Sequence, residues 1–265
     1  MNHEVDPSGD RLALVTGTTR GIGAAVAARL IDRGWNVVGI ARHGGAIEHA
    51  RYRHVRFDLA DTAALAETIE RELGSMVSDA HWRRIGLVNN AAMSGELGPV
   101  EAIDPVDLLQ LSAVNWIAPV WLTGFLIRRA DAAAAVRIVN VSSGAAVQAF
   151  AGLSAYCSSK AALRMAGMVI AKELDSSLRR TPAPRDTSIL SYEPGIVDTD
   201  MQTAARTRPL PANPWGVLFR DFAATGSLVA PAAPAAEIVT FLESDGQPGF
   251  VEQRLNRAES NQPLG

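Results

Sequence analysis

Tyr156 and Lys160 are the residues of this sequence whose types and spacing most directly suggest chemistry. They stand four residues apart in a segment predicted to be helical, so their side chains share one face of the helix. A phenol with a pKa of about 10 is a poor acid–base catalyst at neutral pH, and a neighbouring ammonium group stabilises the phenolate and lowers that pKa. The chain contains only two lysines among its 25 basic residues, so a lysine at this spacing is informative. The pair predicts a proton donor, and the alternative is an ordinary pair on a helix surface.

A glycine-rich turn at residues 16–23 follows the first predicted strand and opens the first predicted helix. Glycines at such a junction permit a tight turn and let a pyrophosphate approach the helix N-terminus closely. The glycine spacing is GxxxGxG rather than GxGxxG, and the alternative is a tightly packed turn that binds nothing. Its position at the first strand–helix junction favours a dinucleotide site.

Arg42 follows the second predicted strand, where the ribose of a bound dinucleotide would lie. An enzyme that uses NAD places an acid there for the ribose 2′-hydroxyl, whereas NADP requires arginine for the 2′-phosphate. Arg20 in the glycine turn could supply a second cation. Together the two arginines favour NADP(H), and the alternative is two solvated arginines in an arginine-rich chain.

Other polar residues fall near the predicted strand ends. Ser142 and Ser143 follow the fifth strand, where a hydroxyl could hold a carbonyl oxygen beside the phenol, although serine pairs also form caps and turns. Asn115 lies inside an apolar helix, where a buried amide needs partners. The single cysteine, Cys157, is interpreted as a small packed residue. The five histidines lack ligand-like spacing, so no metal site is expected.

Short apolar runs that alternate with longer amphipathic segments predict strands and helices in turn. Strands are predicted at residues 12–16, 36–40, 54–57, 85–88, 136–141, 187–192 and 250–255, and helices at 22–33, 62–73, 105–130, 155–178 and 232–243. Strands that are apolar throughout are typical of a parallel sheet covered on both faces. Right-handed crossovers then give a doubly wound α/β fold of Rossmann type. We expect one domain at 11–256, a flexible N-terminus at 1–10 and a tail at 257–265.

Residues 198–231 break this rhythm with four prolines and the aromatic residues Trp215, Phe219 and Phe222. A long irregular insert of this kind suggests a lid over a substrate pocket. Met93, Phe150 and Trp215 are candidates for an apolar pocket wall, with core packing as the alternative.

Composition excludes several classes of protein. With 265 residues, 48% hydrophobic content and a net charge of −3, the chain is expected to fold and to have no nucleic-acid or membrane partner. Its polar start does not look like a secretory signal, and its longest apolar run, residues 113–127, is expected to fall short of a bilayer span. We therefore expect a cytoplasmic protein.

Taken in order, these motifs resemble those of the short-chain dehydrogenase/reductase family over roughly residues 12–252. Residues 16–23 are similar to the family's TGxxxGxG turn, and residues 89–92 to its NNAG motif, with alanine in place of the last glycine. Asn115, Ser143, Tyr156 and Lys160 match the family's catalytic tetrad. Ser143 is preferred to Ser142 because it stands thirteen residues before the tyrosine. Residues 155–161 and 194–202 look like the branch that contains sepiapterin reductase and benzil reductase.

The resemblance implies NADPH-dependent hydride transfer to a ketone or a vicinal dicarbonyl. Ser143 would position the carbonyl oxygen, Tyr156 would donate the proton, Lys160 would lower the phenol's pKa and bind the nicotinamide ribose, and Asn115 would hold a water that links Lys160 to solvent. The implied cofactor contacts are Gly17, Thr19, Arg20, Gly21, Ile22, Gly23, Arg42, Asp58, Leu59, Asn90, Ala91, Tyr156, Lys160, Pro194, Gly195, Val197 and Thr199, with Asp58 at the adenine.

The resemblance also implies an assembly and a far wall of the pocket. Members of the family pair their two long helices across a dimer interface, so we expect a homodimer or a homotetramer. Glu252 falls near the place where an acid of the sepiapterin reductase branch anchors the substrate.

Three alternatives remain from the sequence. A non-catalytic dinucleotide sensor would need the glycine turn but not the tetrad. An NAD-dependent alcohol dehydrogenase would share the tetrad but would not need the two arginines. A hydrolase that used Ser143 would have to recruit a distant histidine.

Overall fold

The computed structural model describes residues 9–175, 184, 186–207, 220–221, 223–225, 227–245 and 249–256. Its centre is one seven-stranded sheet in the order β3-β2-β1-β4-β5-β6-β7, and all of the strand pairings are parallel. The strand order reverses between β1 and β4, and ligands of doubly wound sheets bind beyond the carboxyl ends of the strands at such a point. The predicted fold class is confirmed.

The strands lie close to the predicted apolar runs. Their bounds are β1 Arg11–Thr16, β2 Asn36–Ala41, β3 Tyr52–Arg56, β4 Arg84–Asn89, β5 Ala135–Val141, β6 Thr187–Glu193 and β7 Gly249–Arg254. β2 is buried along its whole length, as a central strand covered on both faces requires. β3 begins two residues earlier than predicted because Tyr52 packs into the core despite its hydroxyl.

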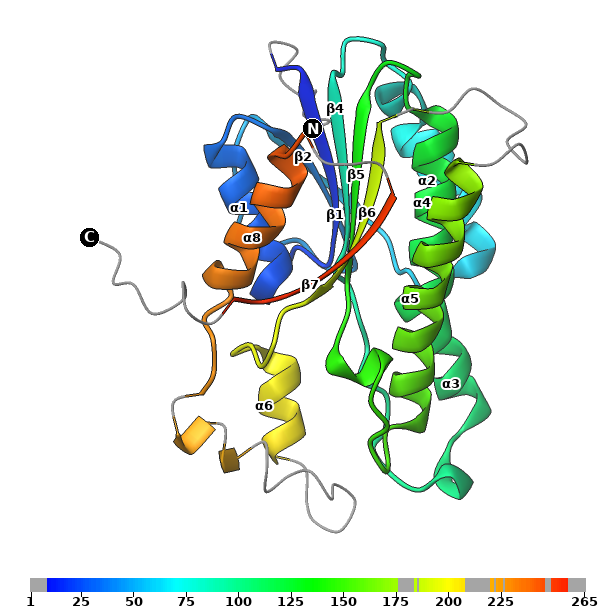
Figure 1. Cartoon of the computed structure of the whole chain (residues 1–265), viewed down its shortest axis with the longest axis vertical. Helices are drawn as coiled ribbons and strands as arrows, with labels where there is room; N and C mark the ends of the chain where they lie inside the picture. Colours follow the sequence, from blue (N-terminus) through cyan, green and yellow to red (C-terminus); the bar gives the residue numbers. More distant parts are fainter. Residues whose placement is uncertain are drawn as a thin grey trace.

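Helices cover both faces of the sheet (Figure 1). One layer contains α1 Gly21–Asp32 and α8 Ala232–Glu243, and the other contains α2 Thr62–Val77, α4 Ala118–Arg129 and α5 Ser154–Leu174. Two hydrophobic clusters fill the spaces between these layers and the sheet. α5 was expected to run to residue 178; it ends at Leu174, and residues 176–178 lie outside the described part of the chain.

The long apolar helix predicted at 105–130 is interrupted. α3 Pro105–Ser112 is followed by one π-helical turn, Ala113–Ile117, before α4 begins. The whole stretch, Pro105–Arg129, has 25 residues and is by length and composition able to cross a membrane, whereas the apolar run singled out from the sequence covers only residues 113–127. More than half of its most apolar window, 56%, is buried inside the fold, as in the core helix of a globular protein.

Part of the insert predicted at 198–231 is regular. It contains α6 Asp200–Thr207, and its two ends are joined by a parallel bridge between Val197 and Val229. In Figure 1, α6 lies beyond the carboxyl ends of the strands. The insert's Trp215, Phe219 and Phe222 lie outside the described residues.

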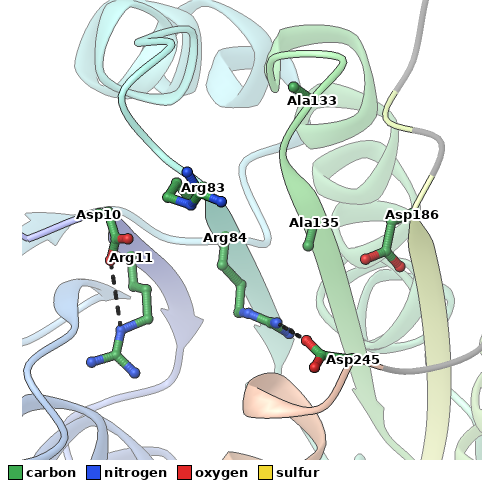
Figure 2. A pocket seen from close by; sticks show the side chains of 8 residues that line it. All are labelled: Asp10, Arg11, Arg83, Arg84, Ala133, Ala135, Asp186 and Asp245. Atoms are coloured by element: carbon green, nitrogen blue, oxygen red, sulfur yellow. Dashed lines mark hydrogen bonds and ion pairs between the residues drawn. The ribbon is translucent and has the colours of Figure 1, made fainter.

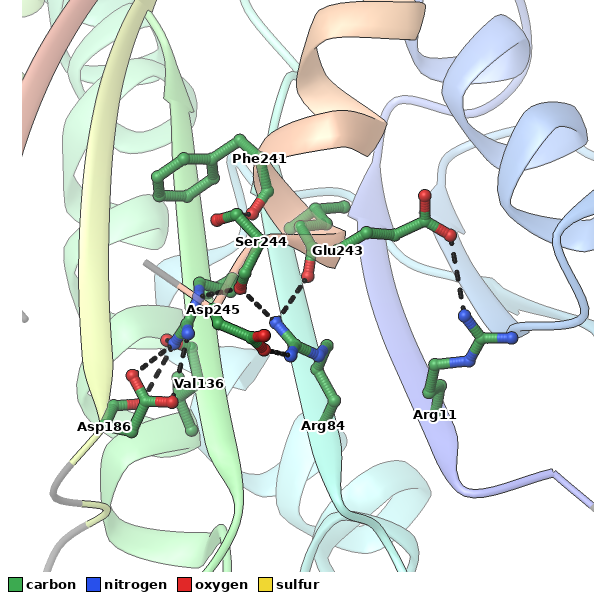
Figure 3. A network of polar contacts seen from close by, with 10 residues as sticks. Arg11, Arg84, Val136, Asp186, Phe241, Glu243, Ser244 and Asp245 are labelled. Atoms are coloured by element: carbon green, nitrogen blue, oxygen red, sulfur yellow. Dashed lines mark hydrogen bonds and ion pairs between the residues drawn. The ribbon is translucent and has the colours of Figure 1, made fainter. Parts of the chain in front are cut away.

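The amino ends of the strands carry a dense polar network (Figure 3). The fully buried Arg137 on β5 donates to both carboxylate oxygens of Asp186, at 2.8 and 3.0 Å, and to the carbonyl oxygen of Ser244 just after α8. Arg84 on β4 also donates to Ser244 and pairs with Asp245 at 2.7 Å. Two guanidinium groups therefore satisfy carbonyls at the C-terminal end of α8.

A cavity of about 360 Å³ opens beside this network, with Arg83 and Arg84 on its wall (Figure 2). Its three arginines are balanced by three aspartates, Asp10, Asp186 and Asp245. It lies at the end of the sheet opposite to Tyr156 and the glycine turn. We therefore interpret it as part of the structural network.

Candidate active site

The predicted proton donor and its neighbours meet at the carboxyl end of β5. Tyr156 and Lys160 lie in the first two turns of α5, and Ser143 follows β5 and precedes a short 3-10 turn, Gly144–Ala146. The side chains of Ser143 and Tyr156 share a hydrogen bond. The structure therefore brings together three of the four predicted catalytic residues around one hydroxyl.

Lys160 is buried, and its environment is unusual for an amine. Its Nζ lies 5.7 Å from the centre of the Tyr156 ring and donates to the carbonyl oxygen of Val141 at 2.8 Å. Only 3% of the residue's surface is exposed, and this burial lowers the pKa of Lys160 to about 8. The ammonium group is thus held beside the phenol with little water to screen its charge.

The pKa of Tyr156 moves in the direction opposite to that expected from the sequence. Burial raises the pKa of Tyr156 to about 12, and this effect outweighs the lowering caused by the hydrogen bond with Ser143. In this state the phenol keeps its proton at neutral pH. A proton donor must start from that form, so the shift is compatible with a reductase.

Asn115 is placed by the π turn rather than by a regular helix. Its side chain exchanges two hydrogen bonds of 2.8 Å with the main chain of Met93 and donates to Ser159 Oγ at 3.0 Å. Through these bonds Asn115 joins the loop after β4 to α5 at Ser159, the residue that precedes Lys160. The Asn115 side chain is therefore fully used in hydrogen bonds. Its main-chain carbonyl oxygen cannot accept the usual α-helical hydrogen bond from residue 119, because Pro119 has no N–H.

The glycine turn has the geometry that a dinucleotide site requires. Gly17 and Gly21 have positive φ values of 73° and 60°, which favour glycine. A Cβ on Gly23 would lie 2.2 Å from the carbonyl oxygen of Gly17, so the helix can begin this close to the strand only with glycine there. The side chain of the N-cap residue, Arg20, makes no capping hydrogen bond to α1, and the first turn holds no acid. Within the described residues the N–H groups of Ile22 and Gly23 are therefore available to a pyrophosphate.

Asn90 and Ala91, which directly follow β4, hold the glycine turn in place through hydrogen bonds. Asn90 Nδ2 donates to the carbonyl oxygens of Thr16 and Gly17 at 2.9 and 3.2 Å, and the main-chain N–H of Ala91 donates to Thr16 Oγ1 at 3.0 Å. Asn90 and Ala91 were predicted to contact the cofactor, and in the structure their polar groups hydrogen-bond to the glycine turn and fix its shape. Thr16 entered the sequence analysis only as the first residue of the glycine motif, and its hydrogen bonds with the N–H groups of Asn90 and Ala91 were not predicted.

The part of the site that is predicted to bind the adenine end of the cofactor is exposed to solvent at Arg42 and Asp58. Arg42 is exposed just after β2, and it has no ion pair with any residue in the described part of the chain. Asp58 is exposed after β3 and accepts from the N–H of Ala60 at 3.0 Å, while Leu59 is buried beneath it. Thr19 Oγ1 donates to the carbonyl oxygen of His43 at 2.9 Å and so ties the glycine turn to this side.

The segment after β6 forms the opposite wall. Pro194 is buried, Gly195 has a φ of 72°, and Val197 is fixed by its bridge to Val229. Thr199 packs against the glycine turn, because a Cβ on Gly21 would lie 3.3 Å from its Cγ2. Of the predicted cofactor residues of this segment, Thr199 therefore lies against the start of α1.

Arg20, predicted to help bind the 2′-phosphate, has another partner. Its Nη1 lies 2.8 Å from Asp200 Oδ2, at the first residue of α6. Asp200 was missed by the sequence reasoning because nothing local links two residues so far apart in the chain.

A second cavity, of about 340 Å³, lies beside Ser143 at the carboxyl ends of β5, β6 and β7. Glu252, the expected substrate anchor, lines it but is held in a two-point ion pair by Arg164, with distances of 2.6 and 2.8 Å. This ion pair lowers the pKa of Glu252. Of the residues suggested for an apolar wall, Met93 packs against the core and Trp215 lies outside the described residues.

The comparisons with known proteins agree with this geometry. The family model for short chain dehydrogenases matches residues 11–209. The chain belongs to the short-chain dehydrogenase family. The resemblance seen in the sequence is confirmed, and the protein is an oxidoreductase of this family.

Individual relatives support the same branch. Benzil reductase ((S)-benzoin forming) of Bacillus subtilis is 29% identical, with 91% of this chain and 96% of the relative covered. Sepiapterin reductase of Xenopus laevis is 31% identical, with 76% of this chain and 78% of the relative covered. A short-chain dehydrogenase/reductase structure from Saccharomyces cerevisiae has a TM-score of 0.75 and 25% identity, with 96% of this chain and 97% of that chain covered.

Proposed function

We propose that this short-chain dehydrogenase is an NADPH-dependent carbonyl reductase that acts on a ketone or a vicinal dicarbonyl. The observation that carries the proposal is the placement of the Tyr156 phenol beside Ser143 and one helical turn from the buried Lys160. NADPH, when bound, supplies the hydride for the carbonyl carbon. The chain supplies the proton, the placement of the oxygen and the electrostatics.

The proton path starts at Tyr156. Ser143 donates a hydrogen bond to the substrate's carbonyl oxygen, and the phenol gives its proton to that oxygen as the carbon is reduced to an alcohol. Tyr156 is left as a phenolate, which the Lys160 ammonium stabilises from the adjacent turn. Lys160 then returns a proton to the phenolate and regains one from solvent, through a water held at the main-chain carbonyl of Asn115.

The glycine turn, the start of α1 and the segment at Pro194–Thr199 fit a dinucleotide. A Cβ on Gly17 would lie 2.9 Å from Asn90 Nδ2 and one on Gly23 would lie 2.2 Å from the carbonyl oxygen of Gly17, so glycine is needed to keep this turn tight. The tight turn leaves the first N–H groups of α1 available to an anion. Arg42 supports NADP over NAD because it is an exposed cation in the place where an NAD enzyme carries an acid. Leu59 and Asp58 would lie at the adenine, and Lys160 at the nicotinamide ribose.

The substrate class rests on the relatives and on the site. Benzil is a vicinal diketone, and benzil reductase and sepiapterin reductase both match most of this chain. L-2,3-butanediol dehydrogenase of Corynebacterium glutamicum, 29% identical over 89% of this chain, is named for a vicinal diol. The substrates named for these relatives carry oxygen atoms on adjacent carbons. The cavity beside Ser143 is also lined by Ser191 and Gln253, whose side chains could hold a second oxygen.

A substrate panel tests the proposal. Initial rates would be measured with benzil, 2,3-butanedione, a pterin diketone and acetophenone, each with NADPH and with NADH. We expect kcat/KM to be highest for a vicinal dicarbonyl with NADPH. A preference for NADH, with faster oxidation of simple alcohols than reduction of any carbonyl, would instead identify an NAD-dependent alcohol dehydrogenase.

We also propose that the protein is a homodimer or a homotetramer. Val106 and Leu109 on α3 and Met165 and Val169 on α5 expose 59%, 68%, 53% and 43% of their surfaces. α3 and α5 contact each other, so these side chains form one apolar area. A second copy of the chain would cover it.

A further inference from the structure

Two carboxylates line the cavity of about 340 Å³ beside Ser143, and they are held very differently. Glu252 on β7 accepts a hydrogen bond from Arg164 at each of its two oxygens, at 2.6 and 2.8 Å. Glu193 is the last residue of β6, and among the described residues its side chain has one partner, Arg254, at 3.2 Å. The carboxylate with spare hydrogen-bonding capacity is therefore Glu193 rather than Glu252.

Glu193 lies against the turn that carries Ser143. A Cβ on Gly144, the residue that follows Ser143, would lie 3.2 Å from Glu193 Oε1. The side chain of Glu193 is 25% exposed, whereas that of its partner Arg254 is 73% exposed. The carboxylate thus belongs to the cavity wall next to the hydroxyl that is proposed to hold the substrate's carbonyl oxygen, and the guanidinium group belongs to the rim.

The ion pair with Arg254 leaves Glu193 open to a ligand. An ion pair with so exposed an arginine is weak, because water screens the charges and the ordered side chain loses conformational freedom. An N–H group of a ligand can therefore replace the guanidinium at small cost, and a carboxylate with little access to water accepts such a hydrogen bond strongly. Glu252 would first have to break both of its hydrogen bonds with Arg164.

We propose that Glu193 is a specificity-determining residue that accepts a hydrogen bond from an N–H group of the substrate. This inference rests on the proposed reductase function and narrows its substrate class to vicinal dicarbonyls that carry an N–H group, such as cyclic keto amides. Ser143 would hold the oxygen of the carbonyl that is reduced, and Glu193 would hold the N–H group on the same wall of the cavity. Benzil, which has no N–H group, lacks this contact.

Isatin and N-methylisatin are matched probes, because both are vicinal dicarbonyls and only isatin has an N–H group. With NADPH, the wild-type kcat/KM should favour isatin by about tenfold, as expected for one hydrogen bond to a charged acceptor that is partly open to water. In Glu193→Ala the ratio should fall to about one. Glu193→Gln keeps the size of the side chain and removes its charge, so a fall to about threefold there separates hydrogen bonding from steric exclusion of the methyl group.

Two control variants each remove a different carboxylate. Glu252→Gln in the same cavity and Glu67→Gln on the exposed surface of α2 should leave the isatin preference within about twofold of wild type. Equal kcat/KM for the two probes in wild type, a preference that survives in the Glu193 variants, or its loss in Glu252→Gln would overturn the inference. Reduction of both probes with NADPH would in each of these cases still support the proposed function.

The opposite failure is also distinguishable. If neither probe is reduced, the proposed function fails, and calorimetric titration of isatin into the protein then decides the inference. Binding that weakens about tenfold in Glu193→Ala would support the role of Glu193. Absent binding, or binding that the substitution leaves unchanged, would overturn it.

Discussion

Replacing Lys160 by methionine should separate stability from activity. The pKa of Lys160 is lowered from 10.5 to about 8 by burial, so below pH 8 the folded protein carries a charge that it would hold more easily when unfolded. At about 1.4 kcal/mol per pKa unit, the difference amounts to about 3 kcal/mol. Only 3% of the residue is exposed, so solvent screens little of this cost.

The sign follows from proton binding. Between pH 8 and 10.5 the unfolded chain holds more protons on this lysine than the folded protein does, so the wild-type free energy of unfolding rises with pH. Lys160→Met removes that contribution. We therefore expect the wild-type free energy of unfolding, relative to that of the variant, to rise by about 3 kcal/mol between pH 7 and 10.5.

Urea unfolding of both proteins at several pH values provides the assay. Lys172→Met is the matched control, because Lys172 is the chain's only other lysine and is exposed on the same helix. The control should show no such dependence, and Lys160→Met should have lost its reductase activity. A difference between wild type and Lys160→Met that stays constant from pH 7 to 10.5 would refute the reasoning about burial.

Three further perturbations have defined outcomes. Arg137→Leu removes the donor to the carbonyl oxygens of Ser244, Val136 and Asp186 and should lower the free energy of unfolding by about 1–3 kcal/mol in urea titrations, whereas an unchanged value would contradict the structural role of the network. Gly23→Ala should abolish cofactor binding in calorimetric titrations, because its methyl group would lie 2.2 Å from the carbonyl oxygen of Gly17, and normal affinity would show that the turn differs from the one described. Wild type should give a dimer or tetramer mass in light scattering at micromolar concentration, and Met165→Glu a monomer mass; a monomeric wild type would argue against the apolar area as an interface.

The sheet could be predicted from the sequence because its strands are short, apolar throughout and separated by helices. β2 could be predicted without tertiary information because its sequence, NVVGIA, is almost entirely apolar, and the structure buries every one of its residues. The glycine turn and the Tyr156–Lys160 pair could also be placed, because both are set by local spacing.

The parts that escaped prediction depend on contacts distant in sequence. The π turn at Asn115 leaves the apolar pattern of the helix intact, and Pro119 was its only local sign. The pairing of Arg20 with Asp200 joins the first helix to α6 and has no local signal. Spacing suggested that Lys160 would lower the pKa of Tyr156, but burial dominates and raises it.

The central claim is that Tyr156 gives its proton to a reduced carbonyl. Its most direct test is Tyr156→Phe, assayed for NADPH oxidation with a vicinal diketone and for NADPH affinity by titration. We expect nearly all turnover to be lost and the affinity to stay close to that of wild type, since phenylalanine keeps the ring and removes only the hydroxyl. Substantial turnover in this variant would contradict the assignment of the proton donor.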